Sequence, residues 1–447
     1  MRGLLSTVAL VLVLAGLGAY IYFVDSKRPD GGVEAKPKVF SVERDAIEEV
    51  TVTADGETST IRKTDGVWKM TSPITGAADD TEANGLTSAI ASLEINRVVD
   101  ESAANLAEYG LAEPRIAIAF KGANGAGGEI HLGQQTPTKS DLYAVKPGEK
   151  RVFLVQAFQE TALAKKSFDL RDKRVLHFER DKVDTIDIVQ PGALGIQLSR
   201  SGSDWVVKQP IQTRGDYSVI EGLLTRLAGA SMTKLVDTSG PQTFGLDKPS
   251  AVITVGAGSA RAALEFGAEE DGAVYVRDPA RQAIFAVDPT LGADAKKPVE
   301  DYRDKDLFEF RNFNASRVKI VRGADTYEFQ KIAATAANTA DKWQRVVAGG
   351  SATDLDLTKM EDLLTKLTSL RAQSFKAANG TGIDKPTVVI SASYDGDKFE
   401  QVQVARGSPD VVASRNGEPG VAVLDTTSFD DMMTALNSIV TPAPTAP

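Results

Sequence analysis

After its first 38 residues, the 447-residue chain repeats one pattern three times. Its three tryptophans, Trp68, Trp205 and Trp343, are spaced almost evenly along the chain. A Gly-x-x-x-Pro pattern keeps nearly the same step, at Gly110 and Pro114, Gly245 and Pro249, and Gly382 and Pro386. A repeat of this length can bury a core of its own. The sequence therefore predicts three tandem domains rather than three turns of a solenoid.

Each copy contains short segments in which apolar and polar residues alternate, typical of half-buried antiparallel strands. The first strand signals are residues 39–44 and 49–53, 175–180 and 185–189, and 307–311 and 317–321. A hairpin ending at the tryptophan follows, and then one main helix. We align Leu86, Leu223 and Met360 on the inner face of that helix, with Thr81 and Asp356 as caps.

Three further strands and a short helix complete each copy. The predicted fold class is therefore α+β, with a mainly antiparallel sheet and one main helix in each of three homologous domains. The predicted boundaries are a transmembrane anchor at 1–24, a flexible linker at 25–38, repeat domains at 39–172, 173–304 and 305–440, and a disordered tail at 441–447.

The amino-terminal segment Leu4–Val24 carries no charged side chain along its whole length. As a helix it would extend about 31 Å, the thickness of a bilayer's hydrocarbon core. It is longer than the apolar region of a signal peptide, and Tyr20, Tyr22 and Phe23 suit a membrane interface. We predict an uncleaved anchor, with a cleaved signal peptide as the alternative. The short amino end favours a single-pass protein of the inner (cytoplasmic) membrane, with its bulk in the periplasm.

The composition argues against several functions. A net charge of −10 and a pI of about 5.0 disfavour binding to nucleic acid, which requires clustered Lys and Arg. The chain has no cysteine and only two histidines, His131 and His177, at non-equivalent places in their repeats. No Walker, GxSxG, HExxH or dinucleotide-binding motif is present. We therefore expect no enzyme activity, no cofactor and no metal.

The candidate interaction residues lie at the two repeat junctions. Arg171, Asp172 and Lys173 end the first copy, and Arg303, Asp304 and Lys305 occupy the corresponding place after the second. These residues either form ion pairs that fix the angle between copies or bind a partner. The tryptophans and the Gly and Pro landmarks are predicted to be structural, with sugar stacking on an exposed ring as the alternative for tryptophan.

These features together resemble the bacterial family called domain of unknown function 4340. The residues that carry the likeness, over residues 4–440, are the apolar amino end, Trp68 with Pro73-Ile74, Trp205 with Pro210-Ile211, the aromatic-Gly-Leu-x-x-Pro turns and the Arg-Asp-Lys junctions. The third copy departs, with Thr381 before its glycine and Ala348–Ser351 replacing Pro-Ile. The resemblance implies a single-span envelope protein, often encoded beside ABC-type transporters related to those of gliding motility. It implies no catalytic residue.

The sequence thus predicts a non-enzymatic, membrane-anchored interaction or assembly module, accessory to an ABC-type transporter. The alternative is an extracytoplasmic protein that binds a glycan or small ligand in a groove containing Tyr109, Trp205 or Phe244. A third reading is a hydrolase that uses two carboxylates, although no particular pair stands out.

Overall fold

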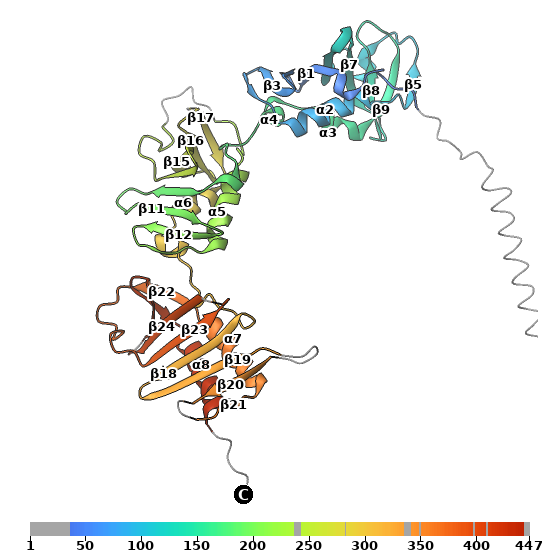
Figure 1. The fold of residues 1–447 in the computed structure, drawn as a ribbon. Helices are drawn as coiled ribbons and strands as arrows, with labels where there is room; N and C mark the ends of the chain where they lie inside the picture. Colours follow the sequence, from blue (N-terminus) through green and yellow to red (C-terminus); the bar gives the residue numbers. More distant parts are fainter. Residues whose placement is uncertain are drawn as a thin grey trace, which may run out of the picture. The chain divides into compact units, whose positions relative to one another are not determined.

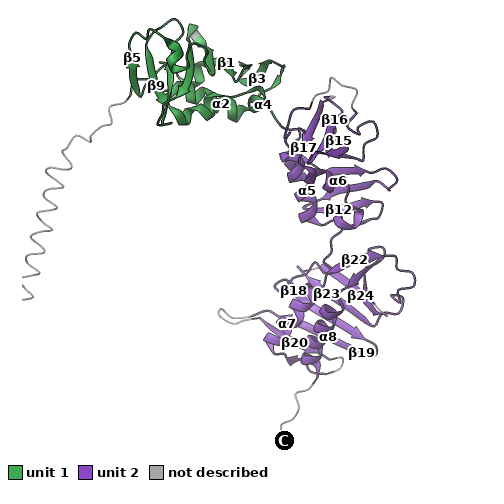
Figure 2. Ribbon diagram, turned by 180° about the vertical axis from the view of Figure 1, so that it is seen from behind, with its two compact units in different colours: residues 1–173 green, residues 174–447 purple. Residues whose placement is uncertain are grey.

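The computed structural model describes residues 36–236, 243–281, 283–334, 341–347, 350–396, 398–407 and 410–441. The chain forms two compact units, residues 1–173 and 174–447 (Figure 2). The predicted anchor, most of the linker and residues 442–447 lie outside the described residues. Within the described ranges, no helix is both long and apolar enough to cross a membrane.

The first unit contains one antiparallel sheet of nine strands, in the order β4-β3-β2-β1-β6-β7-β8-β9-β5 (Figure 1). The strands are β1 (Ile47–Ala54), β2 (Glu57–Thr64), β3 (Val67–Ser72), β4 (Gly76–Ala77), β5 (Arg97–Asp100), β6 (Ile116–Gly122), β7 (Gly127–Gln135), β8 (Asp141–Val145) and β9 (Val152–Gln156). The helices are α2 (Asp80–Ala91), α3 (Glu160–Leu163) and α4 (Ser167–Leu170). Leu86 and Ile90 of α2 are buried in the same core as Ile47 and Ile61 of the sheet.

The second unit contains two antiparallel sheets, one of eight strands in the order β13-β12-β11-β10-β14-β15-β16-β17 and one of nine in the order β21-β20-β19-β18-β23-β24-β25-β26-β22. The strands of the second repeat are β10 (Thr185–Val189), β11 (Ile196–Ser201), β12 (Asp204–Gln209), β13 (Thr213–Arg214), β14 (Ala251–Ala257), β15 (Ala260–Glu270), β16 (Ala273–Asp278) and β17 (Ala283–Val287). Those of the third are β18 (Ala315–Arg322), β19 (Asp325–Ile332), β20 (Lys342–Val346), β21 (Thr353–Asp354), β22 (Ala372–Lys376), β23 (Val388–Tyr394), β24 (Lys398–Arg406), β25 (Val411–Arg415) and β26 (Val421–Leu424). Their helices are α5 (Tyr217–Gly229), α6 (Pro289–Ala295), α7 (Leu357–Thr368) and α8 (Thr426–Val440).

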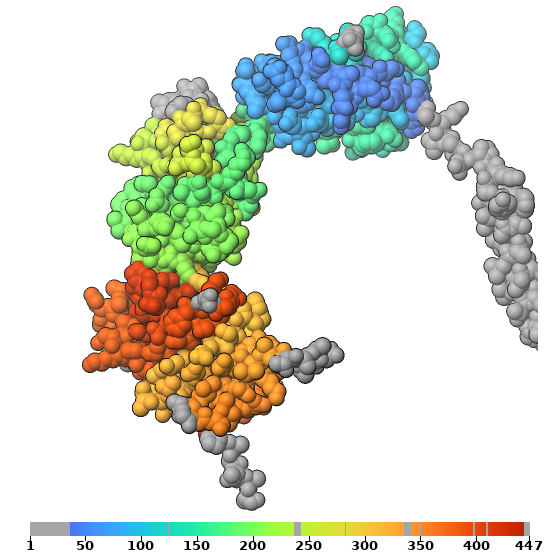
Figure 3. All heavy atoms as spheres, viewed as in Figure 1, coloured from blue at the N-terminus to red at the C-terminus, as the bar shows by residue number. Residues whose placement is uncertain are grey.

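The three repeats therefore share one topology, as the spacing of the tryptophans predicted. Each is mostly β, with a helix (α2, α5 or α7) inserted after the fourth strand. The third repeat differs from the prediction of one main helix, because its terminal helix α8 is longer than α7. Apolar and polar positions alternate along the central strands, so one face of each sheet is buried; the pattern on β23, for example, alternates between buried and half-buried residues. In Figure 3 the atoms of the second repeat (green to yellow) meet those of the third (orange to red) within the second unit.

The main helices begin at equivalent aspartates. The carboxylates of Asp79, Asp216 and Asp356 each accept a hydrogen bond from a backbone amide of the first helical turn. More residues separate Asp216 from Asp356 than separate Asp79 from Asp216. The prediction that Met360 aligns with Leu223 was therefore wrong by almost one helical turn. A longer connection between Trp343 and its helix, compared with that after Trp205, contributes to this shift. The predicted cap Thr81 instead donates its amide to Asp79.

Of the two strand segments predicted at the start of each copy, the second (49–53, 185–189 and 317–321) lies in β1, β10 and β18. The first (39–44, 175–180 and 307–311) lies outside the main sheet. Each segment makes one isolated bridge to the chain that leaves the main helix: Lys38 to Glu94, Arg174 to Ser231, and Asp306 to Arg371. The apolar residues that gave the strand signal are nevertheless buried, including Val39, Val175 and Phe308. The alternation of apolar and polar residues therefore predicted the burial of these side chains correctly, but it did not predict whether the segment belongs to the sheet.

Candidate functional site

The junction Arg303-Asp304-Lys305 is held by backbone hydrogen bonds on both sides. On the side of the second repeat, the amide of Asp216 donates to Tyr302 (2.8 Å) and that of Asp304 to Arg214 (3.0 Å). On the side of the third repeat, the amide of Ala372 donates to the carbonyl of Lys305 (2.8 Å). The junction is therefore an extended segment that pairs with one repeat and then with the next.

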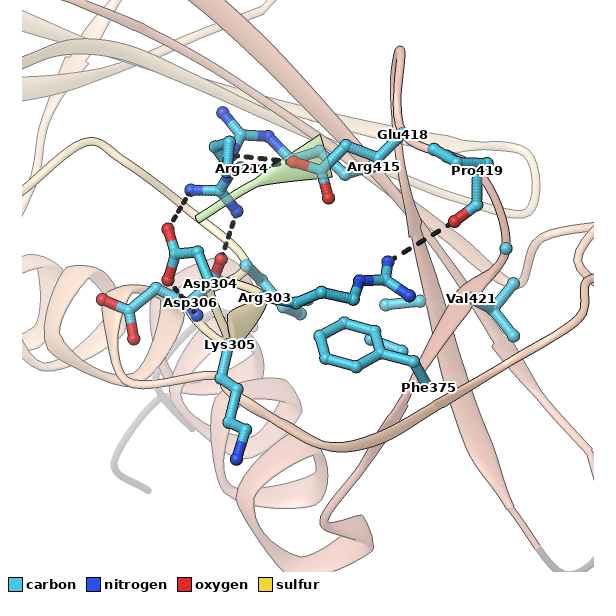
Figure 4. A pocket seen from close by; sticks show the side chains of 14 residues that line it. Arg214, Arg303, Asp304, Lys305, Asp306, Phe375, Arg415, Glu418, Pro419 and Val421 are labelled. Carbon is cyan, nitrogen blue, oxygen red and sulfur yellow. Dashed lines mark hydrogen bonds and ion pairs between the residues drawn. The ribbon is translucent and has the colours of Figure 1, made fainter. Parts of the chain in front are cut away.

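Arg214, the last residue of β13, is the centre of the charged cluster at this junction (Figure 4). Its guanidinium donates to Asp304 Oδ2 through Nη1 (2.7 Å), to Glu418 Oε1 through Nε (2.8 Å) and to the carbonyl of Asp306 through Nη2. Burial opposes its charge, but the surrounding carboxylates raise the pKa of Arg214 on balance. Because Glu418 belongs to the third repeat, this side chain joins the two repeats of the unit directly.

A second arginine, Arg415 at the end of β25, joins two carboxylates of the third repeat. Its Nη2 donates to Glu309 (2.9 Å) and to Glu400 (3.1 Å). Glu400 is almost fully buried and also accepts the backbone amides of Glu309 and Phe310. Burial raises the pKa of this carboxyl. The acceptor capacity of Glu400 is used to hold a backbone turn, which is a structural role.

Arg303 is buried and forms no ion pair with a carboxylate of the described residues, although Glu418 and Glu300 act on its charge from a distance. Its guanidinium carbon lies 3.7 Å from the centroid of the Phe375 ring, and its Nη2 reaches the carbonyl of Pro419 at 3.5 Å. Nε has no hydrogen-bond partner among the described residues. Burial lowers the pKa of Arg303, and the ring face supplies part of the lost solvation. Lys305 points away from this cluster in Figure 4.

The first junction is arranged similarly within its own unit. The amide of Asp79 donates to Leu170 (2.9 Å), and that of Asp172 to Ala77 (3.0 Å). Arg171 Nε donates to Ser167 (3.3 Å), and burial lowers its pKa. Lys173 Nζ donates to the carbonyl of Asp169 (3.0 Å) and lies over the ring of Phe168.

The two junctions nevertheless differ in the residues that form the charged cluster. Ala77 stands just before its helix cap, at the position that Arg214 has in the second repeat. Arg281 lies one repeat length before Glu418, in the corresponding turn of the second repeat. The pair Arg214–Glu418 therefore has no counterpart of matching residue types at the first junction.

All three tryptophans are buried, with 2%, 1% and 3% of the surface of Trp68, Trp205 and Trp343 exposed. Rings at this depth offer no face to a sugar. Trp205 Nε1 donates to Glu221 (2.8 Å), which also accepts from Arg200 (2.6 Å). Burial acts to raise the pKa of Glu221, but these hydrogen bonds and the nearby arginines lower it on balance.

Other aromatic candidates for ligand stacking pack against neighbouring rings. Tyr109 lies 5.1 Å from Tyr143, and Phe244 lies 4.6 Å from Tyr275, measured between ring centroids. All four residues belong to small apolar clusters within their repeats. The rings singled out for a glycan groove therefore contribute to packing.

The glycine landmarks occupy left-handed backbone positions. The φ angles of Gly110, Gly245 and Gly382 are +67°, +71° and +77°, conformations that glycine adopts without steric cost. In the first two repeats a second glycine packs against this turn: a Cβ on Gly133 or Gly267 would lie 2.2 Å from a carbonyl oxygen. The third repeat is looser there, which fits its Thr381 in place of the aromatic residue. Three prolines each stand shortly before the next strand: Pro114, Pro249 and Pro386.

Sequence reasoning singled out the junctions but missed the side chains that surround them. Arg214, Arg415, Glu400 and Glu418 come from strands and turns far from residues 303–305 in the sequence. Comparison of the copies within the chain offers two signals, the change from Ala77 to Arg214 and the change from Arg281 to Glu418. Within the described ranges, no group of three or more His, Asp or Glu side chains is placed to hold a metal ion.

Comparison with known proteins gives a family. The family described as Domain of unknown function (DUF4340) matches residues 68–243 and 205–388. The two matches start at Trp68 and Trp205, one repeat apart. Among solved structures, a DNA polymerase sliding clamp from Pseudomonas aeruginosa aligns with 8% identity over 86% of this chain and 92% of that one, at a TM-score of 0.16, too low to support an argument. A search of the curated proteins gave no match. The two tandem matches show that the chain belongs to the DUF4340 family.

Proposed function

We propose that the protein is a non-enzymatic envelope protein that acts as an interaction or assembly module. Residues 4–24 would anchor it as a single span in the inner membrane, with the repeats in the periplasm, and an ABC-type transporter would be its partner. The module would need no cofactor and would not bind nucleic acid. As part of this proposal, each repeat is an α+β domain and a transmembrane helix precedes the three repeats.

The observation that carries this proposal is the use made of the charged residues at the second junction. Arg214 bonds to Asp304 and Glu418, and Arg415 bonds to Glu309 and Glu400, so these charges serve contacts between protein segments. Such clusters keep repeats in register, which an interaction scaffold requires. A scaffold needs surface area, whereas an enzyme needs titratable groups that converge on an open site.

The test is affinity purification of the full-length protein from native membranes, followed by mass spectrometry. Recovery of transporter subunits at near-stoichiometric levels supports the proposal. A protein recovered without partners, both in mild detergent and after crosslinking, contradicts it. The control is the chain with residues 1–24 replaced by an unrelated single span, which keeps the repeats and therefore keeps the partner.

One observation favours ligand binding as a second function. An open polar cleft in the second unit is lined by side chains of both repeats, among them Tyr217, Arg311, Arg371 and Lys398. Tyr217 is 53% exposed. A glycan or anionic ligand would raise the melting temperature of the wild-type chain but not that of Tyr217→Ala. No shift with either chain across a panel of glycans contradicts this function.

A further inference from the structure

A sheet edge beside the main helix is covered in the first two repeats by the segment that follows each repeat's last short helix. In the first repeat, Arg171 pairs with Ala78, flanked by hydrogen bonds from Asp79 to Leu170 and from Asp172 to Ala77. In the second, Arg303 pairs with Gly215 through the same two bonds. The covering segment in both cases reads apolar or aromatic residue, Arg, Asp, Lys.

The third repeat presents the same edge without such a segment among its described residues. Leu355 donates its amide to Trp343 (2.9 Å), as Gly215 does to Trp205 (2.8 Å). Here, however, neither the amide of Asp356 nor the carbonyl of Asp354 has an outward partner within the described ranges. Asp354 is exposed and Asp356 lies beside it, and β21 is the last strand of its sheet (Figure 1). An edge of this kind is a template for another strand.

The chain's own carboxyl end is poorly suited to cover this edge. Helix α8 continues to Val440, whereas α6 ends at Ala295 and a short 3-10 helix, Val299–Tyr302, leads from it to the junction. The amide of Thr441, which corresponds to the donating amide of Asp304, bonds to Asn437 (3.0 Å). The next residue, Pro442, has no N–H to donate.

The charge of the edge indicates what would bind there. In the second repeat the pairing places Arg214 opposite Asp304, and the two form an ion pair of 2.7 Å. In the third repeat, Asp354 occupies the position of Arg214, just before the helix cap. Lys342 lies 3.1 Å from Asp354, but this pair is more than half exposed and therefore weak. Beside the edge, Val347 and Leu357 are 47% and 40% exposed.

We propose that the edge at residues 354–356 binds an extended segment of a partner protein, which adds to the sheet as a further strand. The segment has Lys or Arg at the position that Asp172 and Asp304 occupy in the two junctions. Two backbone hydrogen bonds would fix the segment, and its basic residue would face Asp354. A second copy of this chain fits poorly, because its own edge is acidic and both of its junction segments present an aspartate. This inference rests on the proposed interaction function and names the surface that would carry it.

The probe is a short peptide with the sequence of residues 167–176, carrying Arg171→Cys as a disulfide with 5-thio-2-nitrobenzoate. The protein thiolate attacks the peptide sulfur, and thionitrobenzoate leaves as its coloured thiolate, so that its release reports pairing. Because the chain has no cysteine, Leu355→Cys provides a single thiol opposite that position. The peptide with Asp172→Lys should form the mixed disulfide about tenfold faster than the peptide with the native aspartate. In the protein variant Asp354→Lys the preference should reverse. Methylation of the peptide amide at residue 172 removes a strand bond and should slow trapping in both proteins.

A second readout is hydrogen exchange of the wild-type protein. Addition of the peptide that carries Asp172→Lys and keeps Arg171 should slow exchange of the Asp356 amide. Equal trapping of both peptides, or trapping unaffected by amide methylation, overturns the proposal. Faster exchange at Asp356 after deletion of residues 442–447 would identify the tail as the segment that covers the edge. A concentration-dependent dimer abolished by Asp354→Lys would identify a second copy as the occupant. Either result overturns the proposal. If membrane partners still copurify in full with Asp354→Lys, this surface is refuted while the proposed function stands.

Discussion

Replacing Arg214 by alanine should uncouple the second repeat from the third. The Arg214 side chain is 19% exposed, and its guanidinium makes charged hydrogen bonds to Asp304 and Glu418 at 2.7 and 2.8 Å. Its removal leaves two part-buried carboxylates without their main counter-charge. Breaking a buried pair costs roughly 3–5 kcal/mol, and hydrogen bonds to charged groups about 1.5–3 kcal/mol each. Since water reaches this site, we expect a loss of about 3 kcal/mol, at the lower end of the range for a buried pair.

The three tryptophans allow each repeat to be followed separately. In each of three backgrounds, two tryptophans are replaced by phenylalanine and the third reports its own repeat by fluorescence during urea unfolding. Arg214→Ala should lower the midpoints reported by Trp205 and Trp343 and separate them from each other. The midpoint reported by Trp68 should not move, because its sheet lies in the other compact unit.

The matched control is Arg62→Ala, which removes an ion pair to Glu49 in the first unit. The Arg62 side chain is 57% exposed, so the expected loss is at most about 1 kcal/mol. A loss for Arg214→Ala no larger than that of the control would refute the reasoning. So would a double-mutant cycle between Arg214→Ala and Asp304→Asn with no coupling energy, since contacting charges should couple by about 1–3 kcal/mol.

Three further predictions concern single repeats. Trp68 Nε1 is buried without a partner among the described residues, and Asn84 occupies the position of Glu221, so Asn84→Glu should stabilise the first repeat against urea by about 1 kcal/mol; no change contradicts this. Gly267→Ala should lower the free energy of unfolding by about 1–3 kcal/mol in thermal unfolding. Gly407→Ala should be nearly neutral, because its new Cβ would lie 3.5 Å from the nearest atom, the carbonyl oxygen of Asp410. Equal losses for the two variants would contradict this reasoning. The pKa of Glu221 is lower in the folded protein than its ordinary value of 4.5. The stability that its carboxylate contributes is therefore complete above pH 4.5 and is lost as the pH falls through the pKa of the folded state. Glu221→Gln should flatten the curve of stability against pH in this acidic range, measured by calorimetry.

The sequence alone predicted the repeated architecture because the constraints behind it are local. A tryptophan that fills a core, a left-handed glycine and a proline before a strand each act on their own stretch of chain, and three copies reinforce the pattern. The alternation of apolar residues marked the buried positions of most strands. The same reasoning failed where local pattern and position diverge, as in the extended segment around Val39, which is buried beside the sheet rather than within it.

The helix register and the candidate site were decided only by the tertiary structure. A constant step misplaced Met360, in large part because a longer connection between β20 and α7 changes the spacing without altering the apolar pattern. The junction residues were visible in the sequence, but their partners Arg214 and Glu418 come from separate repeats. Coulombic and hydrogen-bond energies depend on distance in space, so their arrangement follows from packing and not from spacing along the chain.

What the sequence by itself determined is the number of repeats, their mostly antiparallel construction and the places where one repeat passes to the next. Only the folded chain decided which charges meet at the second junction and which sheet edge is left uncovered among the described residues of the third repeat. The physical reason is the same in both cases. Strand and turn preferences are properties of neighbouring residues, whereas ion pairing and edge coverage depend on segments that lie far apart in the sequence and that the fold brings together.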